Sequence, residues 1–161
     1  MPFLHSHFEG KAQMPDGRIV TIPGAPGLIQ RGPCIPVVIQ VPDQFVAELT
    51  KQGKPVPPPI SGFALIDTGA GSTCIDEEAA KKLGLPVINV VNMASASHGS
   101  HKANVYPAKL QLAGLSMGIN ASSAIGAPLA VQKLLALIGR DVLSHFILIY
   151  NGANGEFTLC I

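Results

Sequence analysis

The hydrophobic residues of this chain occur in short runs separated by glycine and proline, a pattern typical of a β-rich fold with many turns. Cys34–Val41 is a β-branched run that predicts a strand, and Phe63–Ile66 predicts a second, buried strand. Near the end of the chain, Phe146–Tyr150 and Glu156–Ile161 predict a hairpin. The residues between them are rich in asparagine and glycine, which tolerate the positive φ angles of a hairpin loop.

The remaining strand signals are weaker and lie at Val87–Met93, Val105–Leu112, Leu115–Ala124 and Ala136–Ile138. The segment Ala94–Asn104 between the first two is small and polar, which suits the tip of a hairpin. Asp76 predicts the start of a helix, because aspartate is a good N-cap and two glutamates follow it. Asp43–Gln52 predicts another short helix.

The first 33 residues do not follow this pattern. They are rich in glycine and proline and predict an irregular N-terminal arm with one strand at Arg18–Ile22. We therefore divide the chain into an arm, residues 1–33, and one compact domain, residues 34–161. A chain of 161 residues is too short for two domains of ordinary size.

Composition narrows the classes of function. The chain is 47% hydrophobic and 13% charged, and its few basic residues are scattered, which argues against nucleic-acid binding. No apolar run is long enough for a membrane span, and the N-terminus does not resemble a signal peptide. Three widely spaced cysteines argue against a disulfide framework and favour a reducing compartment. We therefore expect a soluble, cytoplasmic domain.

The candidate chemistry lies at Asp67, directly after a predicted buried strand. A carboxylate in such a place is costly unless the protein uses it, because loss of water disfavours the charged form. Gly69 lets the backbone pass close to this carboxylate and donate hydrogen bonds, and the hydroxyl of Thr68 can hold the turn. The pattern predicts a functional acid. The alternative is a turn aspartate that only caps local N–H groups.

The run Asp67-Thr68-Gly69-Ala70 after an apolar strand, with Ile138-Gly139-Arg140-Asp141 downstream, resembles the retroviral-type aspartic proteases (retropepsins) and their bacterial relatives. The resemblance covers about residues 34–161 and implies an all-β, closed, barrel-like acid-protease subunit with one or two short helices. In that family the aspartate is catalytic, here Asp67. The resemblance further implies a supporting role for the loop residues Thr68, Gly69 and Ala70, and for a segment behind the site, Gly139, Arg140 and Asp141.

The same resemblance implies an aspartic endopeptidase that acts on peptides or proteins as a homodimer. The chain has one Asp-Thr-Gly and half the length of a two-lobed pepsin-like chain, so the partner aspartate is expected from a second copy. The two aspartates would share one proton. One would accept a proton from the attacking water, and the other would donate to the peptide carbonyl. Neither a metal nor another cofactor is required.

Further parts of the dimer follow from the resemblance. Thr68 would hydrogen-bond across the two-fold axis, and the last strand would close the dimer. A flap with Ser97, His98 and Gly99 would cover the substrate.

Two positions depart from related enzymes. Pepsin-like sites usually carry a hydroxyl residue where Ala70 stands, and its loss removes a hydrogen bond to the ionised dyad, so we expect a weakly acidic activity optimum. Retroviral enzymes carry an acid where this chain has Gly71, and that acid pairs with the arginine matching Arg140. Arg140 must therefore have another partner here.

Other interpretations remain. A non-catalytic dimerisation or peptide-binding module would keep the fold, but it has no need of two facing carboxylates. Gly69–Cys74 is similar to a dinucleotide-binding loop, but Cys74 replaces the third glycine and Asp67 would repel a pyrophosphate.

The histidine pairs His5/His7 and His98/His101 predict solvated surface rather than metal ligands. Cys74 predicts a small core residue rather than a nucleophile. The N-terminal arm lies outside the resemblance and favours a regulatory role, in which it covers the cleft until it is cut.

Overall fold

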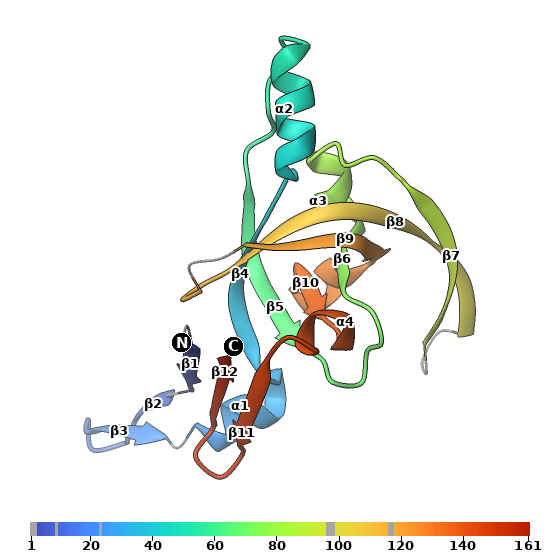
Figure 1. The fold of residues 1–161 in the computed structure, drawn as a ribbon. Coiled ribbons are helices and arrows are strands. Elements are labelled where there is room, and N and C mark those ends of the chain that lie inside the picture. Colours follow the sequence, from blue (N-terminus) through green and yellow to red (C-terminus); the bar gives the residue numbers. More distant parts are fainter. Residues whose placement is uncertain (1–2, 9, 23, 96–98, 116–117) are drawn as a thin grey trace.

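The computed structural model describes residues 3–8, 10–22, 24–95, 99–115 and 118–161, and it shows a mostly β fold (Figure 1). The strands are β1 (Phe3–His7), β2 (Gly10–Gln13), β3 (Ile19–Ile22), β4 (Cys34–Gln40), β5 (Ile60–Ile66), β6 (Cys74–Asp76), β7 (Asn89–Ser95), β8 (Gly99–Leu112), β9 (Gly118–Ala127), β10 (Ala136–Ile138), β11 (Ile147–Asn151) and β12 (Glu156–Cys160). The helices are α1 (Ala25–Arg31), α2 (Asp43–Lys51), α3 (Glu77–Lys82), α4 (Arg140–Leu143) and the 3₁₀ helix η1 (Leu129–Gln132).

Six strands close into a barrel. Their order is β4, β5, β10, β6, β9 and β8, and β8 pairs again with β4 to complete the circle. The pairs β5–β10 and β6–β9 are parallel, whereas the other pairs are antiparallel. The predicted all-β, barrel-like fold is confirmed, although the described residues form four short α-helices rather than one or two. None of the helices in the described part of the chain has the length and apolar character needed to cross a membrane.

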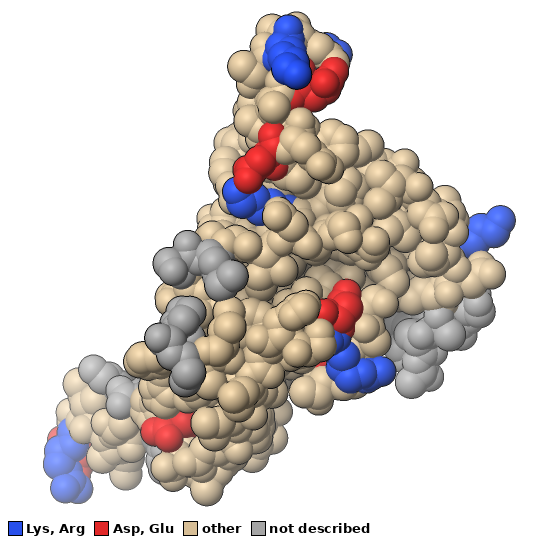
Figure 2. Space-filling model, in the orientation of Figure 1, with Lys and Arg blue, Asp and Glu red and all other residues tan. Residues whose placement is uncertain are grey.

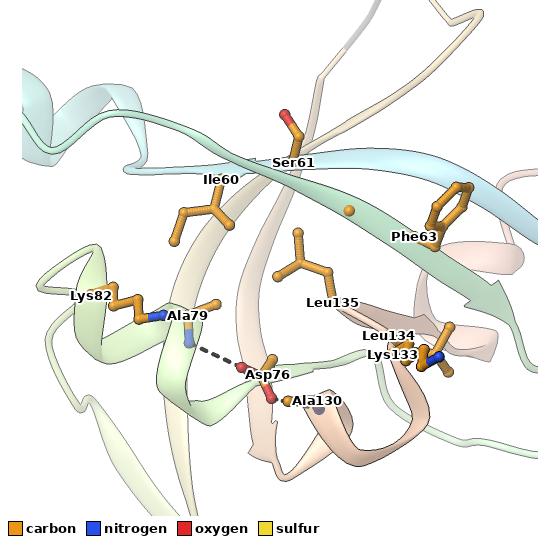
Figure 3. A pocket seen from close by; sticks show the side chains of 11 residues that line it. Ile60, Ser61, Phe63, Asp76, Ala79, Lys82, Ala130, Lys133, Leu134 and Leu135 are labelled. Atoms are coloured by element: carbon orange, nitrogen blue, oxygen red, sulfur yellow. Dashed lines mark hydrogen bonds between the residues drawn. The ribbon is translucent and has the colours of Figure 1, made fainter.

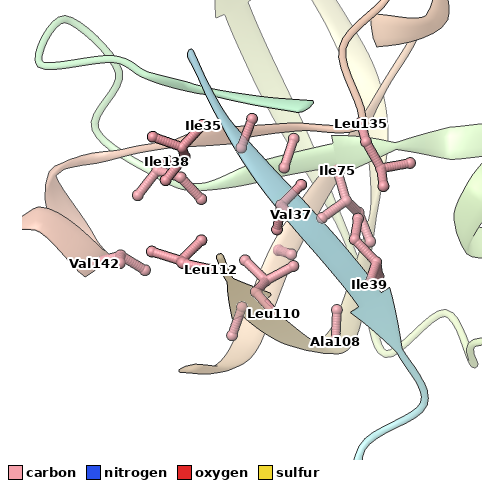
Figure 4. Packing of buried hydrophobic residues seen from close by; sticks show 14 of the residues in the cluster. Ile35, Val37, Ile39, Ile75, Ala108, Leu110, Leu112, Leu135, Ile138 and Val142 are labelled. Atoms are coloured by element: carbon pink, nitrogen blue, oxygen red, sulfur yellow. The ribbon is translucent and has the colours of Figure 1, made fainter. Parts of the chain in front are cut away.

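Branched aliphatic side chains fill the barrel. In β4, Ile35, Val37 and Ile39 are fully buried while the residues between them are more exposed, as strand alternation requires. Leu112 and Leu110 of β8 pair with Val37 and Ile39 and pack against them (Figure 4). This close-packed interior holds the ends of β5 and β10 in place. The candidate site lies at these two strand ends.

The strands predicted within residues 34–161 are all present, with shifted bounds. The largest difference is β8, which begins at Gly99 instead of Val105. Its polar first residues pair with β7 in a two-stranded hairpin, and this pairing needs only the backbone. The polar residues of this segment led to the prediction of a loop, but the backbone continues as a strand.

The first 33 residues are more regular than the sequence predicts. The predicted strand at Arg18–Ile22 appears as β3, but β1, β2 and α1 were not predicted. A proline in the first turn of α1 and the C-cap Gly32 stand at the ends of this helix, so the residues that suggested irregularity define its limits. Leu4 and Leu28 join the hydrophobic core. The division of the chain at residue 33 stays a prediction.

The chain ends in a separate sheet with the order β1, β12, β11. Both edges of β12 are paired within this one chain, to β1 on one side and to β11 on the other. β12 therefore has no free edge at which a second copy could extend the sheet, and the expectation that the last strand closes the dimer stays a prediction. The free edges of this sheet belong to β1 and β11.

Candidate active site

Asp67 stands directly after β5, at the end of the barrel. Its N–H donates to the carbonyl of Ile138 in β10 at 3.0 Å, which continues the parallel pairing of the two strands. Side chains alternate along β5, and Ala64 is fully buried in the core. Phe63, Leu65 and Asp67 therefore share the opposite face. The barrel thus presents Asp67 outward on a rigid strand.

The carboxylate of Asp67 is held by its own loop. Its Oδ1 accepts hydrogen bonds from the N–H groups of Gly69 at 2.9 Å and Ala70 at 3.2 Å. A Cβ at position 69 would lie 3.1 Å from this oxygen, so glycine leaves the space that the turn requires. Oδ2 forms no hydrogen bond with another described residue. One oxygen therefore fixes the carboxylate, and the other is available.

Arg140 holds the same loop from behind. Its Nη1 donates to the carbonyls of Thr68 at 2.8 Å and Gly69 at 2.9 Å, and its backbone N–H donates to the carbonyl of Ala70 at 3.0 Å. These bonds supply the partner that Arg140 needs in the absence of an acid at Gly71. Arg140 thus binds three backbone carbonyl oxygens of the loop.

Asp141 fixes the next part of the loop through Thr73. Its Oδ2 accepts from the backbone N–H of Thr73 at 2.9 Å, and its Oδ1 accepts from the Thr73 hydroxyl at 2.7 Å. Oδ1 also accepts from the N–H of Val142, the next residue in α4. Gly139 donates its N–H to the Thr73 hydroxyl at 3.1 Å. Asp141 is therefore a structural carboxylate in this chain.

Thr68 lies at the exposed tip of the loop. Its carbonyl accepts from Arg140, but its hydroxyl forms no hydrogen bond with any other residue that the structure describes. The Thr68 hydroxyl is exposed and has no partner among the described residues, and the expected hydrogen bond across a two-fold axis stays a prediction.

Cys74 is a buried thiol behind the loop. It packs with Leu129 and with Met93 of β7 in a small apolar cluster. Burial, and then the negative charges of Asp141 and Asp67, raise the pKa of Cys74 to about 11. A neutral, buried thiol fits the predicted small core residue and not a nucleophile.

The predicted flap corresponds to the hairpin of β7 and β8. Ser97 and His98 lie outside the described residues, and Gly99 begins β8 opposite Ser95. Figure 1 shows that the hairpin curves away from the barrel and points to the same side as the loop after β5. A role of this hairpin in covering substrate stays a prediction.

Asp76 is a second carboxylate of the barrel, buried within β6. Its oxygens accept from the N–H groups of Ala79 at 3.1 Å and Ala130 at 2.9 Å, so it caps α3, as predicted, and also holds η1. Figure 3 shows Asp76 at a hollow of about 290 Å³, which Ile60 and Lys82 also line. Both oxygens of Asp76 are used for structure.

Among the residues that the structure describes, no three His, Cys, Asp or Glu side chains gather into a group that would hold a metal ion. His5 hydrogen-bonds to Thr158 at 2.9 Å, and His7 pairs with Glu156 at 3.3 Å, on the terminal sheet. The predicted residues of the loop and of Gly139–Asp141 are thus brought together, whereas these histidines lie apart from them.

Sequence reasoning did not single out Thr73, although it links the two halves of the site. A signal was present, because a hydroxyl residue directly before the apolar pair Cys74-Ile75 needs a partner if it is buried. That partner, Asp141, is 68 positions away.

Comparison with known proteins points to the same part of the chain. A family model for aspartyl proteases matches residues 53–148, which include both the Asp67 loop and the Gly139–Asp141 segment. The chain is similar to a retropepsin-like aspartic protease from Rickettsia conorii, with 16% identity and a TM-score of 0.44 over 98% of this chain and 93% of that one. It is also similar to the retroviral protease-like domain of Ddi1 from Leishmania major, with 17% identity and a TM-score of 0.39 over 73% and 79%. No curated protein matches the chain.

Proposed function

We propose, because the chain belongs to the aspartyl protease family, that it is an aspartic endopeptidase in which Asp67 from each of two identical subunits activates water for peptide-bond hydrolysis. The observation that carries this proposal is the hydrogen bonding of the Asp67 carboxylate. One of its oxygens is fixed by two backbone N–H groups, and the other has no partner among the described residues. A carboxylate that serves only as a cap uses its oxygens locally, as Asp76 does.

The chemistry follows from bringing two such carboxylates together. Two aspartates in contact share one proton, because like charges about 3 Å apart cannot both ionise. The ionised Asp67 accepts a proton from a water molecule, and that water attacks the peptide carbonyl carbon. The protonated Asp67 of the second copy donates to the carbonyl oxygen, and a proton then passes to the leaving amine.

Two surfaces support a homodimer. The Thr68 hydroxyl beside Asp67 is exposed and lacks a partner in the described part of its own chain. On the terminal sheet, Phe3, Ile147 and Ile149 share the outward face and are 62%, 60% and 57% exposed. Large apolar side chains grouped on one sheet face suit burial against a second copy.

The remaining partners and the compartment are proposed on similar grounds. On the face shown in Figure 2, basic and acidic side chains are few and intermixed, which suits a peptide substrate better than nucleic acid. All three cysteines are free thiols, which fits the reducing cytoplasm proposed from the sequence.

A non-catalytic peptide-binding or dimerisation module on the same fold is the second candidate. The intact Asp-Thr-Gly loop and the free oxygen of Asp67 favour catalysis, because a scaffold gains nothing from two facing carboxylates. Cleavage of a peptide library by the wild type and by Asp67→Asn, from mildly acidic to neutral pH, tests the choice. We expect activity in the wild type and none in the variant. Two folded, dimeric and inactive proteins would support the module instead.

A further inference from the structure

An open groove of about 760 Å³ lies on the outer face of β5 and includes Leu65, two residues before Asp67. Phe63 and Leu65 of β5 line it, together with Lys133 and Leu134 from the turn after η1. Figure 3 shows Lys133 and Leu134 on the turn that faces Phe63. Besides β5 and the turn after η1, the N-terminal part of the chain lines the groove, with Phe8 and Arg31.

The position of the groove follows from the alternation of side chains in a strand. Leu65 and Phe63 precede Asp67 by two and four residues on the same face, so they lie about 7 and 13 Å from it along β5. A peptide whose cleaved bond lies at Asp67 and which extends along β5 therefore places a nearby side chain in this groove. The groove thus belongs to the substrate path in the proposed function.

The floor of the groove is apolar. Phe63 is 53% exposed, an unusual state for a phenylalanine in a central strand of the barrel. Phe8 is held in place by its contact with Phe157, whose ring centroid lies 6.4 Å away. An exposed aromatic floor with a fixed aromatic wall favours an apolar side chain in the ligand.

The charged side chains described in the groove are basic. Among the residues that the structure describes, Arg31 and Lys133 are the charged residues that line it, and none of the lining residues is acidic. Both are exposed, and neither side chain forms an ion pair or hydrogen bond with any other described residue. Lys133 is also the one non-glycine residue in the described part of the chain with a positive φ, 58°, at the end of η1. Two cations without an ion-pair partner among the described residues, beside an apolar floor, attract an acidic group.

We propose that this groove selects substrates with an apolar residue next to an acidic residue, on one side of the cleaved bond. The inference rests on the proposed function, since it assigns a specificity to the peptide path toward Asp67. It also gives the N-terminal segment a role. Phe8 and Arg31 would build part of the substrate site, in place of a cover that must be cut away.

Binding to the full-length Asp67→Asn protein tests the inference without cleavage. Two fluorescent peptides with the same apolar residue, one with a neighbouring glutamate and one with glutamine, are compared by anisotropy. We expect the glutamate peptide to bind about threefold more tightly or better, because two exposed ion pairs contribute modestly. The preference should disappear at 0.5 M NaCl, where exposed charges are screened.

Charge reversal assigns the effect to residues. In the background of Asp67→Asn, we expect Arg31→Glu with Lys133→Glu to reverse the preference in favour of glutamine. Lys51→Glu at the exposed end of α2, outside the groove, is the matched control and should leave the preference intact.

Each outcome decides something. Equal binding of the two peptides, absence of binding, or a preference that survives charge reversal would overturn the inference, whether or not the wild type cleaves peptides. If the wild type cleaves neither peptide while the Arg31- and Lys133-dependent preference persists, the proposed proteolysis fails and the groove assignment stands.

Discussion

Thr73 is fully buried, yet its hydroxyl has two partners: it donates to Oδ1 of Asp141 at 2.7 Å and accepts from the N–H of Gly139 at 3.1 Å. These bonds join the loop after β5 to the start of α4. A buried N–H without an acceptor costs free energy, so the Thr73 hydroxyl stabilises both the fold and the loop geometry.

The variant Thr73→Val keeps the shape of the side chain and removes the hydroxyl. We expect the free energy of unfolding to fall by about 1–3 kcal/mol, because the Gly139 N–H loses its acceptor and Asp141 loses a donor. Thr50→Val is the matched control. Among the described residues, the exposed Thr50 hydroxyl bonds only to a carbonyl of its own helix, and we expect a loss below about 0.5 kcal/mol. Urea denaturation of both variants measures the difference, and equal losses would contradict this account.

Cys74 provides a test of burial next to the site. Since its pKa is raised from 9.0 to about 11, the thiolate fraction at pH 8 falls about 100-fold relative to an ordinary thiol. We expect Cys74 to resist alkylation at pH 8 in the native protein and to react once the protein is denatured in guanidinium chloride. Peptide mapping after labelling identifies the modified residue. Rapid native labelling of Cys74 would show that the cluster with Met93 and Leu129 is open.

At the scale of elements, the start of α4 packs directly on the backbone of the loop. A Cβ at Gly139 would lie 2.5 Å from the carbonyl carbon of Ser72 and 2.8 Å from the nitrogen of Thr73. Backbone atoms cannot move aside as a flexible side chain does. Gly139 therefore permits the close approach through which Arg140 and Asp141 reach the loop.

The pair Gly139→Ala and Gly71→Ala tests this packing. We expect Gly139→Ala to lower the free energy of unfolding by about 1–3 kcal/mol and to reduce activity, because α4 must shift away from the loop. At position 71 the added Cβ would meet only Nη2 of Arg140, at an ordinary 3.6 Å. Thermal unfolding and peptide cleavage compare the two. Equal tolerance of both alanines would contradict the proposed contact.

An element could be predicted from the sequence when local residues determine it, and could not when it depends on residues far away in the sequence. Strands such as β4 carry their burial pattern in the sequence, so their period of two could be recognised. β1 could not, because its strand state depends on pairing with β12, about 150 positions away. The same limit applies to the candidate site. Its residues were predictable as motifs, but the bonds of Arg140 to Thr68 and Gly69 span 72 and 71 positions.

At the scale of the whole molecule, the N-terminal segment is part of the packed structure. Leu4 and Leu28 are buried in the main core, and β1 covers one edge of β12. Deleting residues 1–30 would therefore remove core contacts as well as any regulatory contact. A test of regulation by this segment needs point substitutions, such as those proposed for the groove.

The outer face of the terminal sheet, with Phe3, Ile147 and Ile149, is the surface proposed for dimerisation. We expect Ile149→Lys to shift sedimentation equilibrium toward the monomer and to lower activity in proportion, because it places a charge in an apolar contact. Ile29→Lys is the matched control, since Ile29 is 78% exposed on α1 and lies outside this face. We expect it to leave the dimer and the activity unchanged. A dimer that is unaffected by Ile149→Lys would show that the two copies meet elsewhere.

The central claim is that one active site takes Asp67 from each of two chains, and mixing subunits tests it most directly. Wild-type protein at constant concentration is equilibrated with an equal amount of Asp67→Asn protein, and peptide cleavage is measured. Random exchange leaves about a quarter of the dimers fully wild type, so a shared site predicts that activity falls to about half. Activity that is unchanged after verified exchange of subunits would mean that each chain works with its own aspartate alone, and it would contradict the account.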